Sequence, residues 1–102
     1  MTVRIRVLSN LPPGGRCRLY SEYAQALGRQ LKLAVETVYP EGRELPRAPA
    51  LLIGEVQVKP ADGVVIDPED ICRALGTAGI PGANDTQLLE DLQAVVERML
   101  KA

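Results

Sequence analysis

Thiol chemistry in this 102-residue chain would depend on two cysteines, Cys17 and Cys72, and no histidine accompanies them. The lack of histidine removes the usual general base, the base of a catalytic triad and the commonest metal ligand. Two cysteines without histidine are also too few for a structural zinc site. We therefore expect no metal and no cofactor, and Cys17 is the one candidate catalytic thiol.

Cys17 stands between Arg16 and Arg18, near the expected start of a helix. The helix dipole and both arginines favour the thiolate form, which predicts a reactive or redox-sensing cysteine. The alternative is a small apolar residue packed beneath the helix. For Cys72, packing in or near the core is the expected role. A Cys17–Cys72 disulfide is conceivable because both helices should start at the same end of the sheet, but the expected cytosolic context argues against it.

Residues 10–15 contain two prolines and two glycines just before that helix. Backbone N–H groups at such a helix start can bind an anion. The Gly-x-Gly-x-x-Gly and Walker patterns are absent, and no lysine follows where a phosphate loop needs one. A tight strand-to-helix turn is the expected structure. Arg16 and Arg18 leave open a small phosphate, carboxylate or thiol-peptide ligand at residues 12–17.

Asp62, Asp67, Glu69 and Asp70 form the one acidic cluster of the sequence. A hard metal ion would need several oxygen ligands that converge on it. Asp67 is better explained as a helix cap before Pro68, and Glu69 and Asp70 as acidic residues at the positive end of that helix. The expected role of the cluster is therefore structural.

Overall charge and composition argue against several classes of partner. Twelve Lys/Arg against thirteen Asp/Glu give a formal net charge of −1, whereas nucleic-acid binders normally carry a basic excess. The chain has no Trp or Phe and three Tyr, which leaves little aromatic surface for stacking on bases. Arg4 and Arg6 interrupt any N-terminal apolar run, and no stretch reaches the length of a spanning helix. We expect a soluble, cytoplasmic protein that binds neither nucleic acid nor membrane.

Hydrophobic periodicity predicts alternating strands and helices. Residues 3–9 alternate with period two, which is typical of a strand. The run 50–53 is wholly apolar, which favours a strand buried on both faces. The predicted strands are 3–9, 33–39, 50–53 with a continuation through 55–59 after a bulge or turn at Gly54, and 64–66, with a turn at 60–63; the predicted helices start near Arg16, at Asp67 (ending by Gly76) and near Asn84 or Asp85.

This order, β-α-β-β-β-α with an added helix, resembles the thioredoxin-like fold with its middle helix shortened or lost. Residues 48–53 look like the family segment in which a cis-proline, here Pro49, precedes the buried third strand. Residues 54–75 are similar to the hairpin and Pro-Glu-Asp/Glu helix start of small bacterial and archaeal members. The resemblance covers residues 3–76 and implies an α/β domain with a four-stranded mixed sheet and flanking helices. Residues 77–102 would form a linker and an amphipathic C-terminal helix that packs on the same domain or on a partner.

The chain differs from the family at the cysteine motif that carries the family's redox activity. Oxidoreductase members carry Cys-x-x-Cys at the start of the first helix, and the matching residues here are Gly14, Gly15, Arg16 and Cys17. Gly14 thus takes the place of the attacking cysteine and Cys17 that of the resolving one. The resemblance implies that the scaffold is retained and that dithiol–disulfide exchange is lost.

Arg4 and Arg6 fall on the less apolar face of the first strand, which lacks its usual cover if the middle helix is missing. The C-terminal helix would either cover this face or dock on a second copy or a different protein, because large open apolar faces usually mark interfaces.

These observations favour a non-catalytic thioredoxin-like domain that acts by protein–protein interaction, as an adaptor, accessory or assembly factor. Its partner would be another protein or a second copy of the chain. The alternatives are a single-thiol redox protein or sensor that uses Cys17, and a small-ligand binder at residues 12–17. The expected ligand or partner surface consists of Gly14, Gly15, Arg16, Cys17, Ala48 and Pro49.

Overall fold

The computed structural model describes residues 3–9, 14–39, 49–63, 65–80 and 86–101. Along the chain the elements are β1 (Arg4–Leu8), α1 (Gly15–Leu31), β2 (Ala34–Val38), β3 (Ala50–Ile53), β4 (Val56–Gln57), α2 (Pro68–Thr77) and α3 (Thr86–Lys101).

The four strands form one mixed sheet in the order β2-β1-β3-β4. Strands β1 and β2 are parallel because α1 returns the chain to the starting edge, with Ile5 opposite Val35. Strand β3 runs antiparallel to both β1 and β4. The predicted α/β fold with a four-stranded mixed sheet and helices is therefore confirmed.

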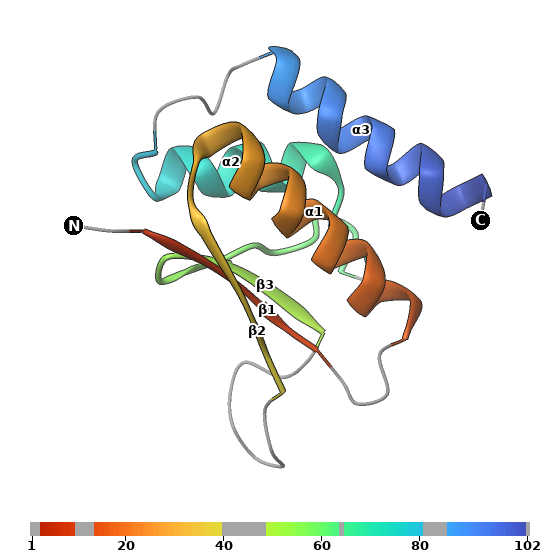
Figure 1. The fold of residues 1–102 in the computed structure, drawn as a ribbon, viewed down its shortest axis with the longest axis horizontal. Coiled ribbons are helices and arrows are strands. Elements are labelled where there is room, and N and C mark those ends of the chain that lie inside the picture. Colours follow the sequence, from red (N-terminus) through yellow and green to blue (C-terminus); the bar gives the residue numbers. More distant parts are fainter. Residues whose placement is uncertain (1–2, 10–13, 40–48, 64, 81–85, 102) are drawn as a thin grey trace.

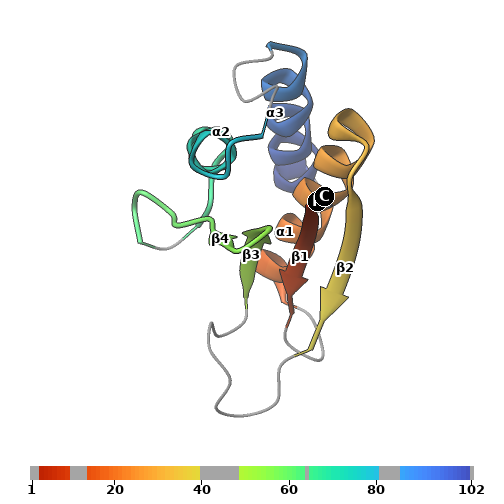
Figure 2. The ribbon, with the colours of Figure 1, turned by 90° about the vertical axis from the view of Figure 1, so that its left-hand side faces the viewer.

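One face of the sheet carries the core. Ile5 and Val7 of β1 alternate toward it, α1 packs on β1, β2 and β3, and α2 packs on β4. Helix α3 lies against α1 and α2, as Figures 1 and 2 show, and adds Leu88, Leu92 and Val95 to the same core. The C-terminal helix thus packs within the chain.

The opposite face of the sheet carries Arg4 and Arg6. The Arg4 guanidinium pairs with the Glu36 carboxylate at 3.2 Å, and Arg6 donates to the Gly54 carbonyl oxygen at 3.1 Å. Because α3 packs on α1 and α2, it does not supply a cover for this face. A second, smaller apolar cluster lies beside the arginines: Leu8, Val38, Ala50 and Leu52.

The predicted strand at 64–66 is wrong for the residues that the structure describes, 65 and 66. The hairpin turn forms at Gly54, which has a φ of +62° and where the sequence analysis expects a bulge or turn, so the fourth strand is Val56–Gln57. Val58 still donates to the Leu51 carbonyl at 2.9 Å, after which the chain leaves the sheet. The predicted turn at 60–63 does form, with Gly63 donating to the Pro60 carbonyl at 3.1 Å.

Ile66 is held by two tyrosines of α1 instead of by a strand. The Tyr20 hydroxyl accepts from the Ile66 N–H at 3.2 Å, and the Tyr23 hydroxyl donates to the Ile66 carbonyl at 3.0 Å. Both tyrosines and Ile66 are buried, so these bonds replace the ladder bonds that the segment lacks.

Raising the pH above 10 should destabilise the fold through Tyr23. Burial, and then the negative charge of Asp67, raise the pKa of Tyr23 well above its ordinary value of 10. The unfolded chain then loses this proton before the folded one, so the stability that Tyr23 contributes is complete below pH 10 and declines above it. Urea unfolding at pH 9 to 11 should give a free energy of unfolding that falls by up to about 1.4 kcal/mol per pH unit more in the wild type than in Tyr23→Phe. Equal slopes would contradict this role.

Gly28 lies inside α1, near the end of the helix. The helix continues to Leu31 and closes with Lys32 in the left-handed conformation, φ +56°, while Leu33 donates to the Gly28 carbonyl at 3.2 Å. A methyl group on Gly28 would lie 2.7 Å from Val35 Cγ2 and 3.1 Å from the Leu33 carbonyl oxygen. Glycine is therefore needed for the close approach of α1 to β2.

Gly28→Ala should lower the free energy of unfolding by about 1 to 2 kcal/mol, because overpacking against a stiff valine outweighs the better helix propensity of alanine. The matched control is Gly76→Ala in α2, where a methyl group would meet no atom within 4 Å. This control should gain up to about 1 kcal/mol. Urea unfolding of both variants measures the difference, and a stabilised Gly28→Ala would disprove the close approach.

Candidate functional site

The candidate site is the start of α1, at the end of the sheet where β1 and β2 finish. Gly14 is the N-cap residue and has no side chain to cap the helix, and its carbonyl accepts from the Arg18 N–H at 3.1 Å. Gly14, Gly15 and Arg16 are exposed. Of the other expected surface residues, Pro49 is half-buried and directly precedes β3, whereas Ala48 and residues 10–13 lie outside the described residues, and with them the predicted cis bond at Pro49.

Pro49 lies at the same end of the sheet as the start of α1. Ala50 pairs with Leu8, the last residue of β1, and β3 runs antiparallel to β1. The chain therefore enters β3 where it leaves β1 for α1. The structure thus brings Pro49 to the sheet end that also carries residues 14–17.

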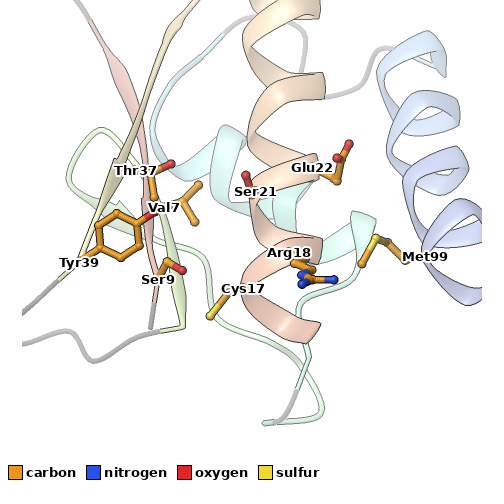
Figure 3. Close-up of a pocket in the computed structure, with 9 residues that line it drawn as sticks. All are labelled: Val7, Ser9, Cys17, Arg18, Ser21, Glu22, Thr37, Tyr39 and Met99. Atoms are coloured by element: carbon orange, nitrogen blue, oxygen red, sulfur yellow. The ribbon is translucent and has the colours of Figure 1, made fainter. Parts of the chain in front are cut away.

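A first hollow of about 290 Å³ opens at Cys17. Only 2% of Cys17 is exposed, and Figure 3 shows its thiol on the side of α1 that faces the strand ends, near Ser9 and Tyr39. Arg18 and Met99 lie toward α3 in the same view. The lining residues are Val7, Ser9, Cys17, Arg18, Ser21, Glu22, Thr37, Tyr39 and Met99. Cys17 is therefore a buried thiol at the edge of a small hollow.

A second hollow of about 450 Å³, here called the groove, lies between α1, α3 and residues 62–68. Its walls are mainly apolar, with Leu19 from α1, Val65 from the connecting segment and Val96 from α3. Gly15 and Arg16 stand at its α1 side, and Asp62 and Asp67 at the opposite side. The first turn of α1 therefore contributes to both hollows.

Cys72 takes no part in either hollow. It is half-buried on α2, and burial, followed by the charge of Glu69, raises the pKa of its thiol. Cys17 and Cys72 are both thiols, so the conceivable disulfide between them is not formed. A raised thiol pKa keeps Cys72 protonated and poorly nucleophilic at neutral pH.

The acidic cluster has structural roles. Asp67 accepts from the Asp70 N–H at 3.0 Å and Asp70 accepts from the Asp67 N–H at 3.0 Å, a reciprocal capping box at the start of α2. Asp62 accepts from the Val65 N–H at 3.0 Å. Among the described residues, no three histidine, cysteine, aspartate or glutamate side chains are grouped to hold a metal ion.

The groove was not predicted from the sequence, because its walls come from three segments that are distant in sequence. The available signal was the width of the apolar stripes on α1 and α3. Leu19, Val96 and Met99 pack against the core yet remain partly exposed, at the edges of these stripes. A residue at the edge of one apolar stripe lines a groove only when the edge of another helix's apolar stripe lies opposite it. Whether the two edges face each other depends on the angle at which the helices cross.

Compared with models of protein families, with curated proteins and with solved structures, the chain matches none. Of the helices that the structure describes, none combines the length and the apolar character that crossing a membrane requires.

Proposed function

We propose that this chain is a non-catalytic thioredoxin-like domain that acts by binding another protein. The proposed family rests on the arrangement of its elements. A parallel β1–β2 pair is connected by α1, and an antiparallel β3–β4 hairpin is followed by a helix that starts with Pro68-Glu69-Asp70. The middle helix has no counterpart among the described residues, and α3 is the added C-terminal element.

One observation carries the proposal that the domain is non-catalytic. In the family pattern the attacking thiol stands at the helix start and is accessible, and here that position is Gly14, which is exposed and has no side chain. The remaining thiol, Cys17, is 2% exposed. Dithiol exchange needs a nucleophilic thiolate and a second thiol to resolve the mixed disulfide, and this helix start supplies neither an exposed thiol nor a pair.

Binding at the start of α1 is supported by the two hollows that meet there. Concave surface beside exposed backbone and an exposed charge is typical of recognition sites. Gly15 and Arg16 border the groove, and Cys17 and Arg18 border the smaller hollow. The function that this geometry supports best is therefore recognition of a protein partner by the surface around residues 14–18.

Site-specific photocrosslinking in the native cell tests this function. A photoreactive amino acid placed at Arg16 should give a discrete adduct heavier than the 11.0 kDa chain. The matched control places it at Arg29, an exposed arginine in the last turn of the same helix. An adduct of twice the chain mass would identify a second copy as the partner. No adduct at Arg16, or the same adducts at both positions, would refute the proposal.

A second candidate function, a single-thiol redox protein or sensor, is favoured by the hollow beside Cys17. In this reaction the Cys17 thiolate would attack the disulfide of oxidised glutathione, form a mixed disulfide and release one glutathione thiolate. Alkylation of Cys17 measured against pH, with Cys72 replaced by serine, tests it. A midpoint near or above that of a free thiol would eliminate this candidate.

A further inference from the structure

The groove continues into a neighbouring hollow with an acidic edge. This second part, about 400 Å³, shares Asp67, Pro68 and Val96 with the groove. Its other lining residues are Glu69, Gln93 and Glu97. Together the two parts form a continuous depression that crosses from the start of α1, over the start of α2, to the C-terminal half of α3.

Charge is distributed unevenly along this depression. The part beside α1 has apolar walls, which include the partly exposed Leu19, Val65 and Val96. The part beside α2 is edged by Asp67, Glu69 and Glu97, all of them exposed. The described lining residues of that second part include no lysine or arginine. The acidic side chains therefore face the solvent next to an apolar hollow.

An occupant of matching chemistry must be apolar at one point and positively charged at a nearby one. A large apolar side chain gains about 1.5 to 3 kcal/mol when it is fully buried, which the first part offers. A lysine or arginine gains from the negative potential of the second part and is steered toward it. An acidic partner would instead be repelled by three carboxylates.

We propose that this depression binds a basic–apolar peptide segment of a partner protein, with its apolar side chain in the groove and its lysine or arginine beside Glu69 and Glu97. The inference rests on the proposed function, protein recognition, and specifies the partner's chemistry. Arg16, at the far side of the groove, would then border the apolar end of the peptide.

Selection from a phage-displayed library of random twelve-residue peptides tests the inference on the full chain. Peptides retained by the wild type should share one large apolar residue with lysine or arginine a few positions away. Fluorescence polarisation of a selected peptide should show at least tenfold weaker binding to Glu69→Lys/Glu97→Lys. The matched control, Glu55→Lys/Glu90→Lys, changes the charge equally at exposed glutamates that line neither part and should bind as the wild type does.

Val96→Gln tests the apolar end independently and should also weaken binding at least tenfold. Thermal unfolding of each variant distinguishes lost binding from lost folding. An acidic consensus or the absence of a consensus among the selected peptides would overturn the inference. So would peptide binding that survives both Glu69→Lys/Glu97→Lys and Val96→Gln. Dimerisation that Val96→Gln abolishes would assign the depression to a second copy and would likewise overturn it. If photocrosslinking at Arg16 gives an adduct but the peptide selection fails, only this inference is refuted. If both photocrosslinking and peptide selection fail, the proposed function is refuted as well.

Discussion

Leu92→Ala should lower the free energy of unfolding by about 3 kcal/mol, within the range for a buried leucine truncated to alanine. Leu92 lies on α3, is 0% exposed and belongs to the main core with Leu88 and Val95. Truncation removes apolar burial and leaves a cavity where α3 meets the rest of the core. Urea unfolding followed by circular dichroism gives the change, and the slope of the transition should stay unaltered.

The matched control is Gln93→Ala, one residue further along α3 and exposed. It should leave the free energy of unfolding within about 0.5 kcal/mol of the wild type. A small effect of Leu92→Ala would mean that α3 contributes little to the core and is available to pack on a partner. A large one makes α3 part of the scaffold that shapes the groove.

Local periodicity was sufficient to predict most elements of this fold. The alternation at residues 3–9 places Ile5 and Val7 on one face, and the structure buries both. The continuous apolar run at 50–53 is buried throughout β3. Asp67 and Pro68 start α2 as predicted, because the capping box and the proline act within a single turn. These signals involve residues that are close in sequence, so no tertiary information was needed to interpret them.

Segment 64–66 shows where local patterns fail. Its β-branched residues favour a strand, but a strand also needs a neighbour with unpaired backbone groups. The hairpin turns at Gly54, and the backbone N–H and carbonyl of Ile66 form hydrogen bonds with the hydroxyls of Tyr20 and Tyr23 in α1 instead. No spacing within the segment encodes that choice, because the competing partners lie more than forty residues away.

The start of α1 was predictable from the sequence, but the hollows beside it were not. The first turn of α1 was identified from Gly14, Gly15 and Cys17, and the structure places it at the end of the parallel strands. The hollow beside Cys17 depends on how α1 lies against the ends of β1 and β2, and the groove depends on α3 and residues 62–68; both arrangements are tertiary. The sequence therefore predicts which residues start α1, and packing decides which of them are exposed.

The wall of the groove formed by residues 62–67 depends on one buried carboxylate. Asp70 is 2% exposed and accepts from the backbone N–H of Ala61 at 3.2 Å and of Asp67 at 3.0 Å. Arg73 pairs with the same carboxylate at 3.3 Å. The two backbone bonds attach Ala61 and Asp67, at the two ends of this segment, to α2. Hydrogen bonds from two backbone amides to an ionised carboxylate stabilise the fold more than bonds to a neutral acceptor would.

Asp70→Ala should therefore lower the free energy of unfolding by about 3 kcal/mol, because it leaves the amides of Ala61 and Asp67 without their side-chain acceptor and removes half of the capping box. Glu69→Ala is the matched control, since Glu69 is a neighbouring, exposed carboxylate in the same helical turn, and its removal should cost less than about 0.5 kcal/mol. Urea unfolding measures both. Hydrogen exchange provides a second readout, because the amides of Ala61, Val65 and Asp67 should exchange faster in Asp70→Ala, while those in α1 change only with global stability. Equal stability losses in the two variants would mean that net charge at the start of α2, rather than these specific bonds, supports the groove wall.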